Sequence, residues 1–367
     1  MDIKPFYPVA EPQLTGHELA YVTDCLTSNR LTHGRYVEAF EQAFAHACGM
    51  NHGVACANGT VALHLALLAL GVKPGDEVLV PTLTYIATAN AVAYCGATPV
   101  LCDVERETWC ISMDEIHKRI TPRTVGILPV HLYGHLAEMD TINAIAKAKN
   151  LWVLEDAAEA HGARYRGRPA GSLARASTFS FYGNKIITTG EGGMVLTNNT
   201  KDLETLRILR GQGMSLTQRY YHPVLGYNYR MTNIQGAIGL AQTERLHWHV
   251  EQHQAVDTAY RALLRAPEIG FQRPMSHTLS SGWMTTILVP ALGRDDLMRR
   301  LAAVNIETRP AFLGAHRMPM YASREPFPVA DEITARGINL PTHAGMTMDD
   351  VSYISGQVLT ALRGEGK

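Results

Sequence analysis

The segment Leu151-Trp152-Val153-Leu154-Glu155-Asp156 is a short apolar run that ends in two carboxylates. Consecutive apolar residues without polar alternation are typical of a strand that is covered on both faces of its sheet. Carboxylates at the carboxyl end of such a strand lie where open α/β sheets bind ligands. We therefore expect a central buried strand here, with Asp156 at the edge of a ligand-binding crevice. A helix N-cap or a metal-ligating carboxylate is the alternative reading of Asp156.

The regions on either side repeat this pattern. Further strand-like apolar runs occur at 53–57, 77–80, 99–104, 124–130, 178–181 and 194–197. Helical patterns occur at 35–48, 60–70, 85–94, 113–120 and 139–147. Strands that alternate with helices favour right-handed crossovers and a sheet that is mostly parallel. The sequence thus predicts an α/β fold.

The C-terminal part of the chain has a different organisation. A long helical pattern at 233–264 predicts a spine helix that leads away from the α/β region. Beyond it, a strand is expected at 283–289 and helices at 295–304 and 349–362. We predict a large domain of residues 1–240, followed by residues 241–367 as the spine helix and a smaller α+β domain.

Composition excludes several classes of protein. The 367 residues are 46% hydrophobic and 18% charged, so the chain can bury a large core. A net charge of −1 gives no footprint for nucleic acid or a membrane surface. Apolar runs are shorter than the roughly 18 residues of a spanning helix, and Met1–Pro5 lacks a secretory pattern. The six cysteines form no C-x-x-C pair, which favours reduced thiols and a cytoplasmic protein.

Lys185 stands out among the basic residues. Only eight of the 33 basic residues are lysines, and Lys185 lies between the apolar run at 178–181 and the glycine cluster Gly190-Glu191-Gly192-Gly193. A lysine that is partly withdrawn from water has a lowered pKa and can act as a nucleophilic amine. An ordinary solvated loop lysine is the alternative.

Asn58-Gly59-Thr60 is a third candidate, because it follows a predicted strand and opens a predicted helix. Backbone N–H groups at a helix N-terminus bind phosphate, although the same tripeptide also suits a simple turn. Pyridoxal 5′-phosphate (PLP) requires a phosphate cradle, an acid on its pyridine nitrogen and a lysine. Asp156 and Lys185 supply the other two groups at strand ends, so the three features together predict a PLP site.

With these residues in place, the sequence resembles the DegT/DnrJ/EryC1/StrS family of PLP-dependent sugar-nucleotide aminotransferases. The resemblance covers almost the whole chain and rests on the segments at 59–64, 75–78, 130–134, 155–158, 180–185, 189–193 and 226–231. Within the family, the segments at 84–92, 179–185 and 227–233 are most similar to those of the enzymes that make GDP-perosamine.

The resemblance implies a fold-type I aminotransferase, a homodimer with shared active sites. It implies that Lys185 forms the Schiff base with PLP and moves protons, and that Asp156 pairs with the pyridine nitrogen. Six further residues would surround the cofactor. Gly59, Thr60 and Ser180 would hold its phosphate, Tyr85 would lie against its ring, Glu159 near its hydroxyl, and Asn228 would reach the phosphate in the neighbouring subunit.

The expected reaction moves an amino group from L-glutamate to C4 of GDP-4-keto-6-deoxy-D-mannose, giving GDP-perosamine for polysaccharide synthesis. Relatives that remove a sugar hydroxyl carry histidine in place of Lys185, which favours transamination here. Two alternatives stay open: a different 3- or 4-keto sugar linked to dTDP or UDP, and a PLP-binding regulator without turnover. Leu313 and Gly314 depart from the pattern of the perosamine-forming enzymes in a region expected near the substrate.

Substrate contacts are the least determined feature. Arg219, Arg230, Arg309 and His316 are candidates for binding the nucleotide sugar, although surface ion pairs are the commoner role of such arginines. His249 and His253 share a face of the predicted spine helix and could bind a metal, but a solvated helix face is the favoured reading. We expect no metal.

Overall fold

A computed structural model describes residues 5–363. The prediction that no secretory signal is present rests partly on residues 1–4, which lie outside this range. The centre of the fold is a seven-stranded sheet of order β1-β9-β8-β5-β4-β2-β3. The strands are β1 (His52–Cys56), β2 (Glu77–Pro81), β3 (Thr98–Cys102), β4 (Thr124–Ile127), β5 (Trp152–Asp156), β8 (Ala176–Ser180) and β9 (Gly193–Thr197). β9 runs antiparallel to β1 and β8, and the other pairings are parallel. The predicted α/β fold with a mostly parallel sheet is confirmed.

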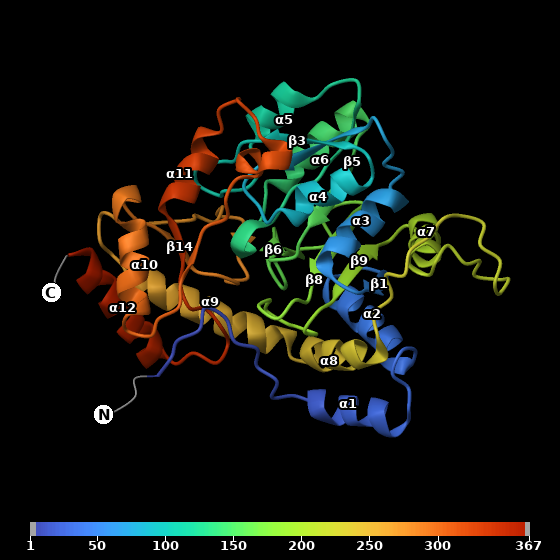
Figure 1. Cartoon of the computed structure of the whole chain (residues 1–367), viewed down its shortest axis with the longest axis horizontal. Helices are drawn as coiled ribbons and strands as arrows, with labels where there is room; N and C mark the ends of the chain where they lie inside the picture. The colour runs from blue at the N-terminus through green and yellow to red at the C-terminus, as the bar shows by residue number, and fades with distance from the viewer. Residues whose placement is uncertain (1–4, 364–367) are drawn as a thin grey trace.

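Helices pack on this sheet as the alternation of patterns predicts (Figure 1). They are α2 (Arg35–Ala47), α3 (Gly59–Ala69), α4 (Ala87–Tyr94), α5 (Met113–Arg119), α6 (Met139–Lys149) and α7 (Thr200–Arg210). α1 (Glu18–Thr27) packs against α8 (Asn233–Glu244). β2, β8 and β9 are buried along their whole length, because both of their faces are covered. α7 was not predicted from the sequence, although Leu203, Leu206 and Leu209 recur at helical spacing. Its N-cap is Asn199, whose side chain accepts from the N–H groups of Lys201 and Asp202.

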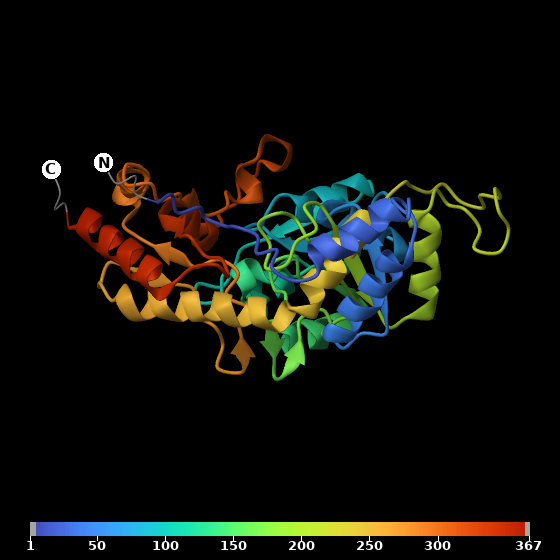
Figure 2. The same cartoon turned by 90° about the horizontal axis from the view of Figure 1, so that it is seen from below.

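The spine predicted at 233–264 consists of α8 (Asn233–Glu244) and α9 (Leu246–Leu263), which meet at Arg245 (Figure 2). Beyond it lie α10 (Arg294–Ala302), α11 (Pro328–Arg336) and α12 (Met348–Leu362). An antiparallel sheet joins β10 (Gly270–Phe271), β12 (Thr286–Leu288), β14 (Gly337–Asn339) and β13 (Arg309–Pro310). A second apolar cluster forms between α9, α12 and this sheet. The division at residues 240 and 241 stays a prediction.

Short elements complete the architecture. A three-stranded sheet pairs β11 (Thr278–Leu279) with β6 (Arg164–Tyr165) and β7 (Arg168–Pro169), so it joins the C-terminal part to the α/β part. The 3-10 turns are η1 (Leu132–Gly134), η2 (Ala291–Gly293), η3 (Ala315–Arg317) and η4 (Pro319–Tyr321). None of the helices within residues 5–363 combines the length and the apolar character needed to cross a bilayer. All six cysteines are buried and free of disulfides.

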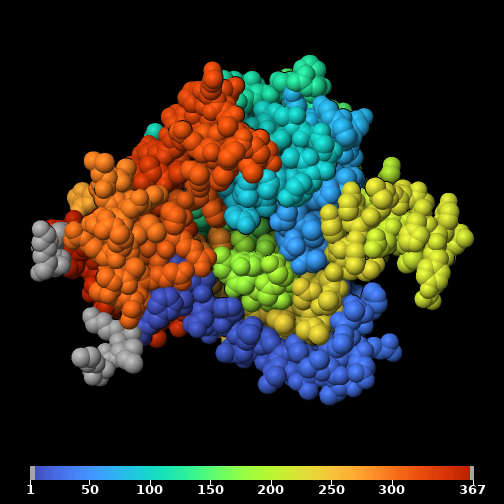
Figure 3. All heavy atoms as spheres, viewed as in Figure 1, coloured from blue at the N-terminus to red at the C-terminus, as the bar shows by residue number. Residues whose placement is uncertain are grey.

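Residues 211–228 form an arm that projects from the body of the molecule beyond α7 (Figures 1 and 3). The neck of the arm is narrow, since a Cβ atom on Gly213 or Gly226 would collide with the backbone of the opposite segment. Five large apolar side chains on the arm are exposed: Leu216, Tyr220, Tyr221, Val224 and Leu225. Exposed apolar side chains that gather on one projecting segment are typical of interaction surfaces.

Candidate active site

Three chain segments converge at one edge of the central sheet. Asp156 is the last residue of β5 and Ser180 is the last residue of β8, the strand paired with β5 in parallel. Gly59 begins α3, and a Cβ atom at its position would lie 2.7 Å from the Cβ of Ser180. The sheet therefore brings the predicted acid and the predicted phosphate cradle to the same edge, as expected for an open α/β sheet.

Asp156 is buried and held by two donors. Thr88 donates its hydroxyl proton to Oδ2 at 2.8 Å, and the N–H of Ala158 lies 3.2 Å from Oδ1. Burial raises the pKa of Asp156, while these hydrogen bonds and the charge of Lys185 oppose the rise. A buried carboxylate of this kind is stabilised by a cation, and the protonated nitrogen of a pyridine ring is one. The role of Thr88, the second residue of α4, was not predicted.

The neighbouring Glu155 points to the other face of the strand and has a structural role. Its Oε1 accepts from the N–H of Leu173 at 2.7 Å. Its Oε2 accepts from the N–H of Gly171 at 2.8 Å and lies 3.1 Å from Nε2 of His131. Because Nδ1 of His131 accepts from the N–H of Ala137, Nε2 is the protonated nitrogen that donates to Glu155. Of these two adjacent carboxylates, Asp156 faces the candidate site and Glu155 stabilises the surrounding structure.

Lys185 lies in the loop between β8 and β9, with a side chain that is only 11% exposed. Its Nζ is 3.6 Å from Oε1 of Glu159 and 3.9 Å from the centre of the Trp283 ring. Burial lowers the pKa of Lys185, and the charges of Glu159 and Asp156 oppose this. Burial raises the pKa of Glu159, whose Oε2 accepts from the N–H of Tyr133 at 2.8 Å. The alternative of a solvated loop lysine does not describe this environment.

The N-terminus of α3 is arranged as an anion cradle. Asn58 caps the helix by accepting from the N–H of Val61 at 3.0 Å. The N–H groups of Gly59 and Thr60 belong to the first turn, which has no intrahelical acceptors. Ser180 places its hydroxyl beside Gly59. These donors suit a phosphate group.

Aromatic rings line the side of the site that faces the C-terminal part. Tyr85 is exposed and its ring centre lies 5.9 Å from that of Phe312. Phe312 stacks on Tyr133 at 5.3 Å, and Tyr133 stacks on Trp283 at 6.2 Å. Neither Tyr133 nor Trp283 was predicted for the site. A planar ligand would meet Tyr85 at the open end of this row.

The candidate substrate residues are dispersed. Arg219 lies on the arm, with its guanidinium 4.9 Å above the Tyr220 ring. The backbone of Arg230 bridges to Cys56, close to the phosphate cradle. Arg309 is exposed and pairs with Glu307 at 3.1 Å. The exposed Asn228 lies at the base of the arm, where its backbone bridges to Gly211.

His316 is buried between two partners. Its Nδ1 lies 2.7 Å from Oγ1 of Thr82 and its Nε2 lies 3.0 Å from Oδ1 of Asp331. The ring also stacks on Phe327 at 4.4 Å. Both nitrogens are engaged, so the geometry favours a role for His316 in anchoring the segment that carries Leu313 and Gly314. A direct contact with substrate stays a prediction.

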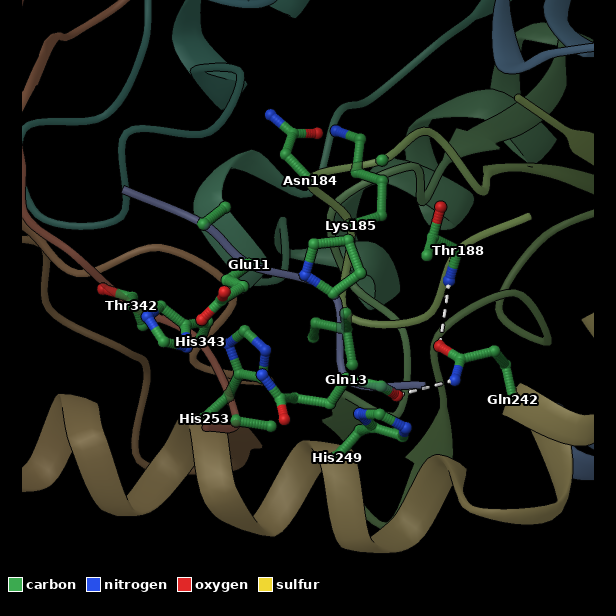
Figure 4. Close-up of a pocket in the computed structure, with 15 residues that line it drawn as sticks. Glu11, Gln13, Asn184, Lys185, Thr188, Gln242, His249, His253, Thr342 and His343 are labelled. Atoms are coloured by element: carbon green, nitrogen blue, oxygen red, sulfur yellow. Dashed lines mark hydrogen bonds between the residues drawn. The ribbon is translucent and has the colours of Figure 1, made fainter. Parts of the chain in front are cut away.

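A narrow pocket lies behind the loop of Lys185, between residues 10–13, the spine helices and residues 342–344 (Figure 4). His249 and His253 line it and are buried, so the prediction of a solvated helix face is wrong for these two residues. The N-terminal segment folds back over this face of α9. His247, on the same helix, is exposed, and its Nδ1 lies 3.1 Å from Oε2 of Glu251. Burial lowers the pKa of His249 to about 4 and of His253 to about 3, so both are neutral. Within residues 5–363 no group of three or more side chains is placed to hold a metal ion.

Comparisons with known proteins agree with this geometry. The model of the DegT/DnrJ/EryC1/StrS aminotransferase family matches residues 12–359. A GDP-perosamine synthase of Caulobacter vibrioides is 48% identical over 360 residues, which cover 95% of this chain and 96% of the relative. A GDP-perosamine synthase of Escherichia coli O157:H7 is 44% identical, with coverage of 95% and 96%.

Solved structures extend the likeness to three dimensions. An aminotransferase from Streptoalloteichus hindustanus superposes with a TM-score of 0.94 at 27% identity, covering 98% of this chain and 100% of that one. Enzymes of this family use PLP. The fold, the convergence of Lys185, Asp156 and Gly59, and the match over almost the whole length agree. The chain therefore belongs to the DegT/DnrJ/EryC1/StrS aminotransferase family.

Proposed function

We propose that this PLP-dependent aminotransferase transfers the amino group of L-glutamate to C4 of GDP-4-keto-6-deoxy-D-mannose. The product is GDP-perosamine, a precursor for polysaccharide synthesis. The observation that carries the choice of substrate is the 48% identity, over 95% of the chain, to a GDP-perosamine synthase. The observation that carries the chemistry is the buried amine of Lys185 at the sheet edge that also bears Asp156.

The residues present suit the cofactor. Gly59, Thr60 and Ser180 would hold its phosphate, and Asp156 would accept a hydrogen bond from its protonated pyridine nitrogen. When bound, PLP supplies an electron sink for the carbon that loses its proton. A carboxylate at Asp156 keeps that sink effective, because it stabilises positive charge on the ring nitrogen.

Lys185 is proposed to carry the proton between the reacting carbon atoms. A general acid and base works best when its pKa lies near the working pH, and burial lowers the pKa of this amine. Glu159 holds the amine when it is charged. In the first half-reaction, glutamate leaves as 2-oxoglutarate and its amino group stays on the enzyme. In the second, the keto sugar takes that group, so both substrates use one site in turn.

The substrate assignment is tested by incubating the purified protein with PLP, L-glutamate and one keto sugar at a time. We expect mass spectrometry to find an aminated product from GDP-4-keto-6-deoxymannose and little from dTDP-4-keto-6-deoxyglucose. Product from the dTDP-sugar alone would keep the aminotransferase and overturn the GDP assignment. If neither sugar gave a product in a protein that still binds PLP, the proposed activity on these sugars would be wrong. That result would favour the alternative of a PLP-binding regulator without turnover.

We further propose a cytoplasmic homodimer whose two sites are shared. The projecting arm supports this, because its exposed apolar side chains need a partner surface and Asn228 lies at its base. In this arrangement each site takes Lys185 from one subunit and Asn228 from the other. The two halves of such a site can be inactivated in different chains.

Mixing two inactive variants tests the shared site. Lys185→Ala and Asn228→Asp are each expected to be inactive alone, the latter because a carboxylate repels the phosphate. After co-refolding, mixed dimers contain one intact site, so we expect about a quarter of the wild-type specific activity in a closed two-fold dimer. Refolding each variant with itself is the control. Activity that does not return in mixed dimers would mean that Asn228 serves its own subunit.

A further inference from the structure

The amine of Lys185 rests on an aromatic face. Its Nζ lies 3.9 Å from the centre of the Trp283 ring, which is 2% exposed. The carboxylate of Glu159 is the anion nearest to the amine, at 3.6 Å. The amine therefore lies in contact with both a carboxylate and a π face. Cations over a tryptophan face are attracted by the ring quadrupole, more strongly when water is excluded.

Trp283 is fixed by contacts on several sides. Its indole Nε1 donates to the backbone oxygen of Asn184 at 2.7 Å, directly before Lys185. Its ring stacks on Tyr133. The preceding Gly282 has φ +68°, and a Cβ there would lie 2.9 Å from the backbone oxygen of His253. The ring is thus tied both to the lysine loop and to the spine helix, so its distance from the amine is set by the fold.

We propose that Trp283 is a positioning residue that, with Glu159, holds the amine of Lys185 in place whenever that amine is not bonded to the cofactor. The inference rests on the proposed role of Lys185 and extends it to a residue 98 positions further along the chain. The indole would favour the ammonium form, and it would keep the amine from turning toward the pocket behind the loop. Trp283 would then determine the position of the Lys185 amine between proton transfers and would favour its charged form.

The groups that face the amine decide the sign of the effect. Glu159 and Asp156 favour its charged form, and burial opposes that form. His161 also senses the charge of Lys185, but burial lowers the pKa of His161 to about 3, so it is neutral. Weakening the π face removes one contribution that favours the ammonium. The midpoint of titration of Lys185 must then move to lower pH.

The test measures that midpoint in the protein without cofactor. The protein is pulsed with acetic anhydride at a series of pH values, and the acetylation of Lys185 is read from its peptide, with the exposed Lys201 as an internal standard. Only the neutral amine reacts. In Trp283→Leu we expect the titration midpoint of Lys185 to move to lower pH. We expect about tenfold more acetylation of Lys185 at neutral pH, which corresponds to the loss of a partly desolvated cation–π contact. Trp283→Phe keeps a π face and is expected to lie between Leu and wild type.

An isosteric series separates charge from packing. Tryptophan analogues with one, two or three ring fluorines, placed at position 283, keep the shape and the N–H but weaken the π face step by step. We expect the midpoint to fall with each fluorine, while the labelling rate at high pH, which reports access to the amine, stays constant. A midpoint that does not change across the series would overturn the proposal. Labelling needs no turnover, so a shift in a protein that aminates no sugar would refute the proposed function and leave this inference standing.

Discussion

Lys185→Ala is expected to lower kcat for amino transfer by about 10³-fold or more, because the variant loses both the nucleophilic amine and the proton carrier. The loss should affect both half-reactions equally, since the same amine moves the proton in each. Release of 2-oxoglutarate from glutamate and amination of the keto sugar are followed separately by mass spectrometry. Binding of PLP should survive, because the phosphate cradle of α3 and Asp156 are untouched.

The matched control is Lys201→Ala, which removes an exposed lysine at the start of α7. It should keep wild-type rates. Added methylamine offers a further check, because a small amine can enter the space left by the side chain and restore part of the proton transfer. If Lys185→Ala kept more than a tenth of wild-type activity, the assignment of Lys185 as proton carrier would be wrong.

The layers of this fold were predictable because they follow local patterns. The buried strands are apolar runs, and the helices between them have periodic apolar positions. Both kinds of element can therefore be predicted from local sequence without tertiary information. Asp156, Gly59 and Lys185 were found for a related reason, because Asp156 ends a strand, Gly59 begins a helix and Lys185 lies in the loop that follows β8. The sheet then brings such ends together.

Other features depend on contacts between distant parts of the chain. The indole of Trp283 bonds to Asn184 across 99 residues, and no spacing rule reaches that far. His249 and His253 looked solvated because their helix is polar, but the N-terminal segment covers them. Asn228 entered through the family resemblance rather than through its own chemistry, because a residue that serves a neighbouring subunit has no signal within its own chain.

Adjacent carboxylates on β5 allow the sharpest separation of catalysis from stability. Asp156→Asn is expected to lower kcat by about 10²- to 10³-fold, as for removal of a single preorganised electrostatic partner. The amide still accepts from the N–H of Ala158, and the hydroxyl of Thr88 can rotate to accept from it. The variant should therefore fold normally.

Its stability has a defined pH dependence. Because burial raises the pKa of Asp156, the folded protein holds this proton more tightly than the unfolded chain does. Stability of the cofactor-free protein therefore falls as pH rises from the unfolded pKa through the folded one. Asp156→Asn removes this loss, so we expect its melting temperature without PLP to equal or exceed that of wild type at neutral pH. A lower melting temperature would mean that the carboxylate also supports the fold.

Glu155→Gln should behave in the opposite way. Its two oxygens accept from Leu173, Gly171 and His131, so an amide at this position must turn its NH₂ toward at least one buried donor. We expect the free energy of unfolding, measured in urea, to fall by about 1.5–3 kcal/mol, the range for a buried hydrogen bond to a charged group. The folded fraction should keep most of its activity at low temperature, because Glu155 points away from the cofactor side of the strand. Asp156 and Glu155 would then differ in their effects on both activity and stability. This difference is expected because successive side chains of a strand point to opposite faces, here one toward the site and one toward the scaffold.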